Sequence, residues 1–124
     1  MDPDEVIGAQ FRAYRPAPGY VRCDHPDGAE VTGQDAREAL QAIASLANGR
    51  PTPVLVDLRE ARSVSREARK SFALSAVPAR IAMYVESSLS RVIANFFIGV
   101  SRPSVPTRVF TDLDDAQRWL LDDQ

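Results

Sequence analysis

The chain has 124 residues, of which 44% are hydrophobic and 26% are charged, and its formal net charge is −2. A chain of this length forms one domain, residues 1–124, whose core needs neither disulfides nor metal ions. The slightly negative charge argues against nucleic acid as a partner, because affinity for phosphates comes from clustered cations.

A single cysteine, Cys23, and a single histidine, His25, limit the chemistry that the chain can carry. A lone cysteine forms no intramolecular disulfide or cysteine-based metal site, and a lone histidine excludes sites built on histidine pairs. A Ser-His-Asp triad would rest on His25 alone, in a turn flanked by proline and glycine. No paired carboxylates or nucleophile beside a base stand out, so we expect no enzyme, no metal and no cofactor.

The pattern of apolar residues bears on the cellular compartment. No apolar stretch approaches the roughly 20 residues that span a bilayer. Residues 1–5 are acidic and lack the basic start of a signal peptide. We therefore expect a cytoplasmic protein without a membrane partner.

The first part of the chain predicts strands and then a helix. Residues 9–15 and 19–24 are short, contain aromatic and branched side chains, and flank a proline-rich turn, which favours an antiparallel pair at one edge of a sheet. Residues 34–47 have a helical pattern, in which Thr32 and Asp35 resemble a capping box. Asn48-Gly49 then ends this helix.

The run Val54-Leu55-Val56-Asp57-Leu58 is the strongest strand signal in the chain. It is apolar without alternation, which is typical of a strand buried on both faces at the centre of a parallel sheet. We expect it to lie between a strand over residues 81–85 and one strand of the N-terminal pair.

The remaining elements alternate between helices and strands. Helices are predicted over residues 66–75 and 89–100, a strand over 80–85, and a last strand over 107–110 that precedes a helix capped by Asp112. The resulting order, ββαβαβαβα, predicts an α/β fold with a mixed, largely parallel sheet.

This order resembles the STAS domain, the SpoIIAA-like fold of bacterial anti-sigma-factor antagonists. The resemblance is carried by the strand ending in Asp57, by the serine-led helix start at residues 63–67, and by Val109-Phe110-Thr111-Asp112 near the end of the chain. It is greatest to small uncharacterised bacterial SpoIIAA-like proteins. We therefore expect a STAS-like domain with helices mainly on one face of the sheet.

Two serines occupy the region where the regulatory STAS proteins are phosphorylated. Those regulators carry Asp-Ser-Ser-Gly or a close variant, whereas this chain reads Arg62-Ser63-Val64-Ser65-Arg66, without an Asp-Ser pair or a glycine. Ser63 and Ser65 are candidates either for phosphorylation beside neighbouring arginines or for capping the helix.

A second set of candidates lies at the ends of strands, where α/β proteins place their sites. Asp57 is either a ligand-binding residue or a carboxylate that fixes its turn by accepting loop N–H groups. Ser87, Ser88 and Arg91 precede or begin a helix and are candidates for an anion site, although serines also serve simply as helix caps.

These observations lead to one leading function and one alternative. We expect a non-catalytic interaction or regulatory module that binds an unidentified protein partner and forms a homodimer through the apolar residues Phe97, Ile98 and Val100. The alternative is a small-ligand or lipid-binding protein, or a weak enzyme, that uses a strand-end cleft near Asp57 and Ser87. An apolar cleft of several hundred Å³ with convergent polar groups favours the alternative, and a flat surface favours the interaction module.

Overall fold

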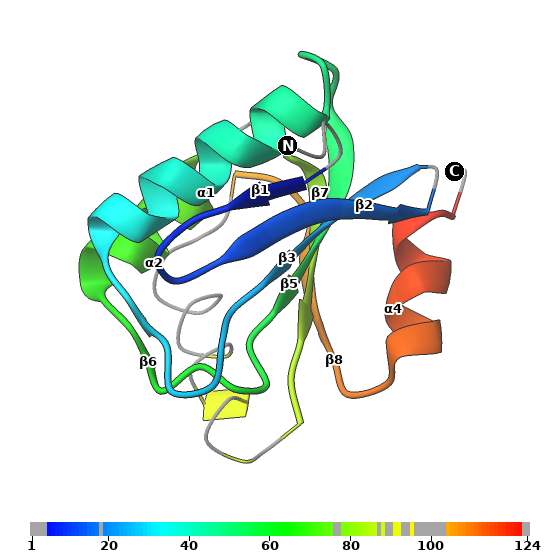
Figure 1. The fold of residues 1–124 in the computed structure, drawn as a ribbon. Helices are drawn as coiled ribbons and strands as arrows, with labels where there is room; N and C mark the ends of the chain where they lie inside the picture. The colour runs from blue at the N-terminus through cyan, green and yellow to red at the C-terminus, as the bar shows by residue number, and fades with distance from the viewer. Residues whose placement is uncertain are drawn as a thin grey trace.

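The computed structural model describes residues 5–17, 19–75, 78–86, 88, 91–92, 95 and 104–122. Its centre is a six-stranded sheet in the order β1-β2-β3-β5-β7-β8 (Figure 1). The strands are β1 (Glu5–Ile7), β2 (Arg12–Ala17), β3 (Tyr20–Asp24), β5 (Thr52–Asp57), β7 (Pro78–Tyr84) and β8 (Thr107–Phe110). The pairs β1–β2 and β2–β3 are antiparallel, whereas β3, β5, β7 and β8 run parallel to their neighbours. The mixed, largely parallel sheet predicted from the sequence is confirmed.

Strand β5 lies at the centre of this sheet, as its apolar run predicts. It pairs with β3 on one side and with β7 on the other. Val54 and Leu55 have no exposed surface, and Val56 is buried as well. The absence of alternation therefore reflects a strand that is covered on both faces.

The described helices cover the two faces of the sheet unequally (Figure 1). Helices α1 (Gly33–Leu46) and α2 (Arg66–Leu74) pack on one face, and α4 (Leu113–Leu120) packs on the other. Successive strand residues point to opposite faces. Val54 and Val56 accordingly join the core beneath α1 and α2, whereas Leu55 packs against Leu120 of α4.

The helix caps predicted at Thr32 and Asp112 are present. Thr32 and Asp35 form the capping box of α1, with the Asp35 amide 3.2 Å from Thr32 Oγ1 and the Thr32 amide 2.9 Å from Asp35 Oδ2. Asp112 caps α4 by accepting a hydrogen bond of 3.0 Å from the Asp115 amide. Each cap satisfies amides that the first helical turn leaves without partners.

The start of the chain differs from the prediction of a single strand over residues 9–15. Two strands, β1 and β2, occupy this region, and a turn closed by the Gly8 amide and the Phe11 carbonyl separates them. A Cβ at position 8 would overlap the Phe11 ring, so the turn requires glycine. Strand β2 also continues through Pro16, because the β2–β3 register is irregular between Tyr14 and Ala17 and needs no regular ladder bond there.

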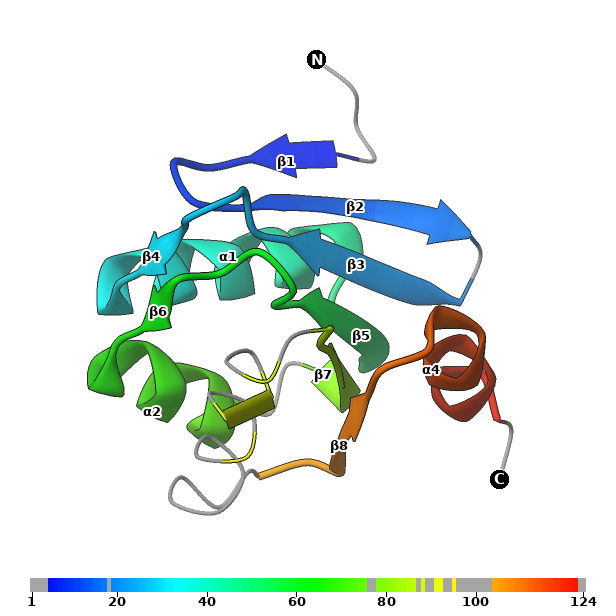
Figure 2. The ribbon, with the colours of Figure 1, turned by 90° about the horizontal axis from the view of Figure 1, so that it is seen from below.

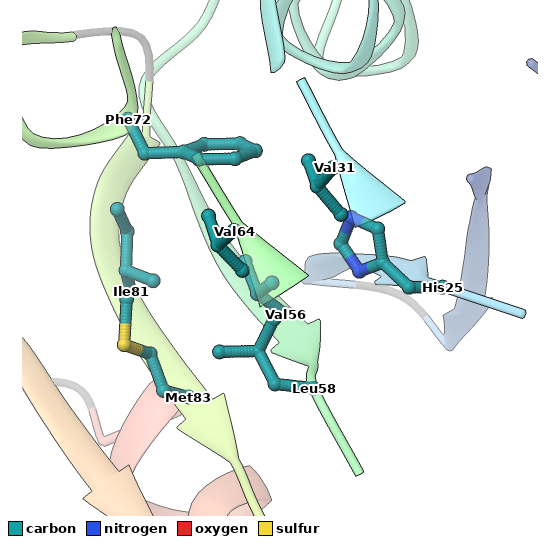
Figure 3. A pocket seen from close by; sticks show the side chains of 8 residues that line it. All are labelled: His25, Val31, Val56, Leu58, Val64, Phe72, Ile81 and Met83. Atoms are coloured by element: carbon teal, nitrogen blue, oxygen red, sulfur yellow. The ribbon is translucent and has the colours of Figure 1, made fainter. Parts of the chain in front are cut away.

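A second, two-stranded ladder was not predicted. Strands β4 (Glu30–Val31) and β6 (Ser63–Val64) pair in parallel beside α1 and α2, apart from the main sheet (Figure 2). The Arg62 amide donates to the Ala29 carbonyl at 2.8 Å, and the Ser65 amide donates to the Val31 carbonyl at 2.9 Å. We call this ladder the β4–β6 roof, because Val31 and Val64 point from it toward the main sheet (Figure 3).

Part of the predicted helix over residues 89–100 lies outside the described residues. Phe97, Ile98 and Val100, on which the predicted homodimer rests, are among the residues that are not described. Val92 is described and is 63% exposed. The homodimer therefore stays a prediction.

Candidate binding site

Asp57 ends β5 and is held by two arginines. Its carboxylate lies 3.0 Å from Nη2 of Arg22 and 2.8 Å from Nη2 of Arg59. The Arg59 amide also donates to Asp57 Oδ1 at 3.0 Å, which fixes the turn after the strand. Burial acts to raise the pKa of Asp57, but the hydrogen bonds from Arg59 and the charges of both arginines outweigh it and hold the pKa below its ordinary value.

The two arginines belong to a wider polar surface built on β2, β3, β5 and β7. Arg22 Nε donates to Asp24 at 2.7 Å, and the Tyr14 hydroxyl donates to the same carboxylate at 3.0 Å. The Arg59 guanidinium lies 4.4 Å from the centre of the Tyr84 ring. We call this surface the Asp57 platform; its members are Arg12, Tyr14, Arg22, Asp24, Asp57, Arg59 and Tyr84.

The Asp57 platform shares the face of the sheet that α4 partly covers. Leu55 packs under α4, and Asp57 is two residues further along the same strand, so both side chains lie on one face. Arg22 stands in the same relation to Tyr20, which also packs under α4. Helix α4 thus covers the amino-terminal half of these strands, and the platform occupies their carboxyl ends.

Cys23 lies between platform residues in the sequence but faces the opposite side of the sheet. It has no exposed surface and belongs to the core beneath α1 and α2. Burial, with smaller contributions from the charges of Asp24 and Asp57, raises the pKa of its thiol to about 12. The thiol is therefore protonated at neutral pH and is a poor nucleophile.

His25 follows β3 directly and is buried. Its Nδ1 lies 3.1 Å from the main-chain oxygen of Asp57, and its Nε2 has no hydrogen-bond partner among the described residues. Burial lowers the pKa of the imidazole, despite the opposing effect of the hydrogen bond to Asp57 and of nearby carboxylates. The ring is therefore neutral near pH 7.

Two hollows adjoin His25. A cavity of about 20 Å³ lies between the main sheet and the β4–β6 roof, and we call it the His25 cavity (Figure 3). Its walls are His25, Val31, Val56, Leu58, Val64, Phe72, Ile81 and Met83. The second hollow is an open groove of about 360 Å³ on the outer surface, lined by Ile7, Gly8, Ala9, Phe11, Arg12, Asp24, His25 and Pro26. The cavity is the more enclosed of the two but small, the groove is larger and more open, and Asp57 lines neither.

The serine candidates occupy separate places. Ser65 is the N-cap of α2, where its Oγ accepts a hydrogen bond of 3.0 Å from the Ala68 amide. Ser63 is exposed in β6. Ser88 and Arg91 are exposed, and Ser87 lies outside the described residues, so an anion site near residue 87 stays a prediction.

The sequence prediction missed the contribution of β3 to this region. Arg22 contacts a carboxylate 35 positions away, and His25 lies buried beside the end of β5. One signal was available: His25 directly follows a predicted strand, at the edge where parallel strands end together. The flanking proline and glycine instead favoured an exposed turn.

Two other features, a cluster of metal ligands and a membrane-spanning helix, do not occur in the described part of the chain. Within it, no group of three or more histidine, cysteine, aspartate or glutamate side chains is arranged to hold a metal ion. The helices found there are also too short or too polar to cross a membrane.

Comparison with known proteins identifies similar chains of unknown function. A model of the family described as Domain of unknown function (DUF7793) matches residues 18–123. An uncharacterized protein of the DUF3478 family from Shewanella loihica PV-4, which has a SpoIIAA-like fold, is 18% identical, with 93% of this chain and 98% of that chain covered and a TM-score of 0.60. A protein of unknown function from Arthrobacter sp. FB24 is 36% identical over 87% of this chain and 96% of its own, with a TM-score of 0.36. No curated protein sequence is similar to the chain. The likeness to the Shewanella protein shows that the fold is SpoIIAA-like, in agreement with the STAS resemblance.

Proposed function

The chain belongs to the DUF7793 family, and we propose that it is a non-catalytic interaction module whose binding surface is the Asp57 platform. The observation that carries this proposal is the pairing of Asp57 with both Arg22 and Arg59. A general base needs an accessible lone pair and a pKa close to the working pH. Asp57 instead has its oxygens occupied and its pKa lowered, so it serves to hold the two arginines in place.

The composition of the Asp57 platform suits a protein interface. Arginine and tyrosine are enriched among the residues that contribute most to protein binding, and the platform contains three arginines and two tyrosines. The side chain of Arg59 is 31% exposed and that of Arg12 is 50% exposed, so both are available to a partner. Arg12 lies on β2 and pairs with Glu5, and Arg59 lies in the turn after β5 and pairs with Asp57. Because both guanidinium groups are already held in place, binding would cost less entropy.

The charges of the Asp57 platform indicate the chemistry of the partner. Arg12 and Arg59 have the most exposed charged groups of the arginines here, whereas Asp57 is covered by its own ion pairs. A protein that presents acidic side chains at this spacing would complement the surface. The cytoplasmic location and the homodimer predicted from the sequence are part of the same proposal.

Paired arginine variants test the proposal. The tagged chain is used to capture proteins from its native cells, and the affinity of each purified candidate is then measured for wild type, Arg59→Gln and Arg108→Gln. Arg108 is a matched control, because it is also an exposed arginine over aromatic rings, 5.3 Å from Phe110. We expect Arg59→Gln to weaken binding on the order of tenfold and Arg108→Gln to leave it unchanged.

Two results would contradict the proposal. One is equal affinity of wild type and Arg59→Gln for every captured protein. The other is turnover of a metabolite by the purified chain that Asp57→Asn abolishes while the variant remains folded.

A further inference from the structure

The geometry points to a ligand site in the His25 cavity that accepts a small neutral molecule with an apolar body and one O–H or N–H donor. This inference is independent of the Asp57 platform, which lies on the other face of the sheet. It rests on three observations: a buried nitrogen without a partner, an apolar wall around it, and a roof above it that is not part of the main sheet.

The tautomer of His25 follows from its one hydrogen bond. The Asp57 main-chain oxygen is only an acceptor, so Nδ1, 3.1 Å away, must carry the proton and donate it. In the neutral ring Nε2 then has a bare lone pair. Nε2 is buried and has no partner among the described residues, and a buried acceptor without a donor costs free energy. A ligand that brings a donor would recover that cost.

The walls of the cavity restrict what else the ligand carries. Apart from His25, every described residue that lines the cavity is aliphatic, aromatic or a methionine. A charged group would be buried there without a counter-ion, which is strongly unfavourable. The ligand is therefore neutral and apolar except at its donor.

A single water molecule satisfies this site poorly. About 20 Å³ is enough room for one water. A buried water normally makes two to four hydrogen bonds, but the lining side chains offer only Nε2. A ligand hydroxyl with an apolar body replaces such a water at a gain, because its remaining surface contacts the apolar walls.

The cavity is smaller than a ring-sized ligand, so binding must enlarge it, and two features allow this. Val31 and Val64 belong to the β4–β6 roof, which is a separate two-stranded sheet and shares no ladder with the main sheet beneath it. Met83, on the sheet side, has an unbranched side chain that adapts readily to a changed cavity. Figure 3 shows the roof residues on one side of the space and Met83 with Ile81 on the other.

Phenol and toluene test the inference, because they have nearly the same shape and differ in one hydroxyl. Binding is followed by the methyl resonances of Val31 and Val64, and the Nε2 resonance is followed in a nitrogen-15 spectrum of the chain's one histidine. We expect both probes to shift the methyl resonances and phenol alone to shift Nε2. The preference for phenol over toluene should be roughly tenfold greater in wild type than in His25→Phe, which keeps a ring but lacks the acceptor.

A second variant covers the case in which His25→Phe does not fold. Val64→Ile adds one methylene group to the wall and fills a cavity of this size, while His25 is retained. It should weaken phenol binding at least about tenfold, whereas Val6→Ile, a matched change outside the cavity walls, should not. The inference is overturned if neither probe gives a saturable shift, if the phenol preference is the same with and without His25, or if Val64→Ile binds phenol as wild type does.

Discussion

The Nδ1 of His25 lies 3.1 Å from the main-chain oxygen of Asp57, which joins the end of β3 to the end of β5. The side chain of Asp57 meanwhile binds Arg22, which also belongs to β3. Asp57 thus connects the two strands twice, through its main chain beside the His25 cavity and through its carboxylate on the α4 face. The paired ends of these strands are held by residue-specific contacts in addition to the regular ladder.

The burial of His25 predicts a stability that depends on pH. The pKa of His25 is lowered below 6.5 in the folded protein. As the pH falls below 6.5, the unfolded chain takes up a proton that the folded protein excludes, so the free energy of unfolding decreases. Urea unfolding at about pH 7.5 and about pH 5.5 measures this decrease.

His25→Phe is the control for this prediction. Because the chain has one histidine, the variant should lose most of the pH dependence in this range. Equal pH dependence of wild type and variant would show that His25 is not the group responsible.

Removal of the Asp57 charge should destabilise the protein. Asp57→Asn removes a buried charge that pairs with both Arg22, whose side chain is 13% exposed, and Arg59, while Arg22 keeps its ion pair with Asp24. We expect a loss of about 1 to 2 kcal/mol in the free energy of unfolding, since two ion pairs to a buried carboxylate are broken but Arg22 keeps one counter-charge and Arg59 is partly exposed to water. Asp24→Asn is the comparison: its side chain is 28% exposed, and it should cost less than about 1 kcal/mol.

Variants of Ser65 distinguish its role as the N-cap of α2 from a role as a phosphorylation site. Ser65→Ala should lower the free energy of unfolding by about 1 kcal/mol, whereas Ser65→Asp should leave it nearly unchanged, because aspartate caps as well as serine does. Ser63→Ala, at an exposed position in β6, should have no measurable effect. We also expect both Ser65 variants to bind partners with equal affinity. Opposite effects of the two variants on partner affinity would instead indicate that Ser65 is a phosphorylation switch.

The central strands of the main sheet and two helix caps could be predicted because they are marked locally. Val54 to Val56 are apolar without interruption, and Asp112 stands one helical turn before Asp115, as capping requires. These signals lie within a few residues of the element that they define, so a single sequence reveals them.

The β4–β6 roof and the partners of Asp57 lacked such signals. Two-residue strands show no periodicity, and β4 pairs with a strand that is more than 30 positions away. The contacts of Asp57 with Arg22 and His25 likewise depend on the register of β3 against β5. Which polar side chains meet at a strand end is a property of the assembled sheet, and for that reason Asp57 could be named but its environment could not.

Self-association is a further prediction of the sequence. The apolar residues between 97 and 100 favour a homodimer with two-fold symmetry. Light scattering at tens of micromolar, where an affinity of about −8 kcal/mol becomes visible, should give the mass of a dimer. The mass of a monomer, 13.6 kDa, across this range would be inconsistent with the prediction.

The titration of the Asp57 carboxyl group, followed by carbon-13 NMR, tests most directly whether this residue anchors a binding surface or performs chemistry. The two arginines that hold it stabilise its charged form, so it should remain ionised through the neutral and mildly acidic range and titrate only below the ordinary value of 3.8. The part of the stability that it contributes should be present above pH 3.8 and be lost as the pH falls through its lower, folded-state pKa. A pKa raised toward neutrality would instead be that of a carboxyl group suited to proton transfer, and it would contradict the assignment of the Asp57 platform as a non-catalytic binding surface.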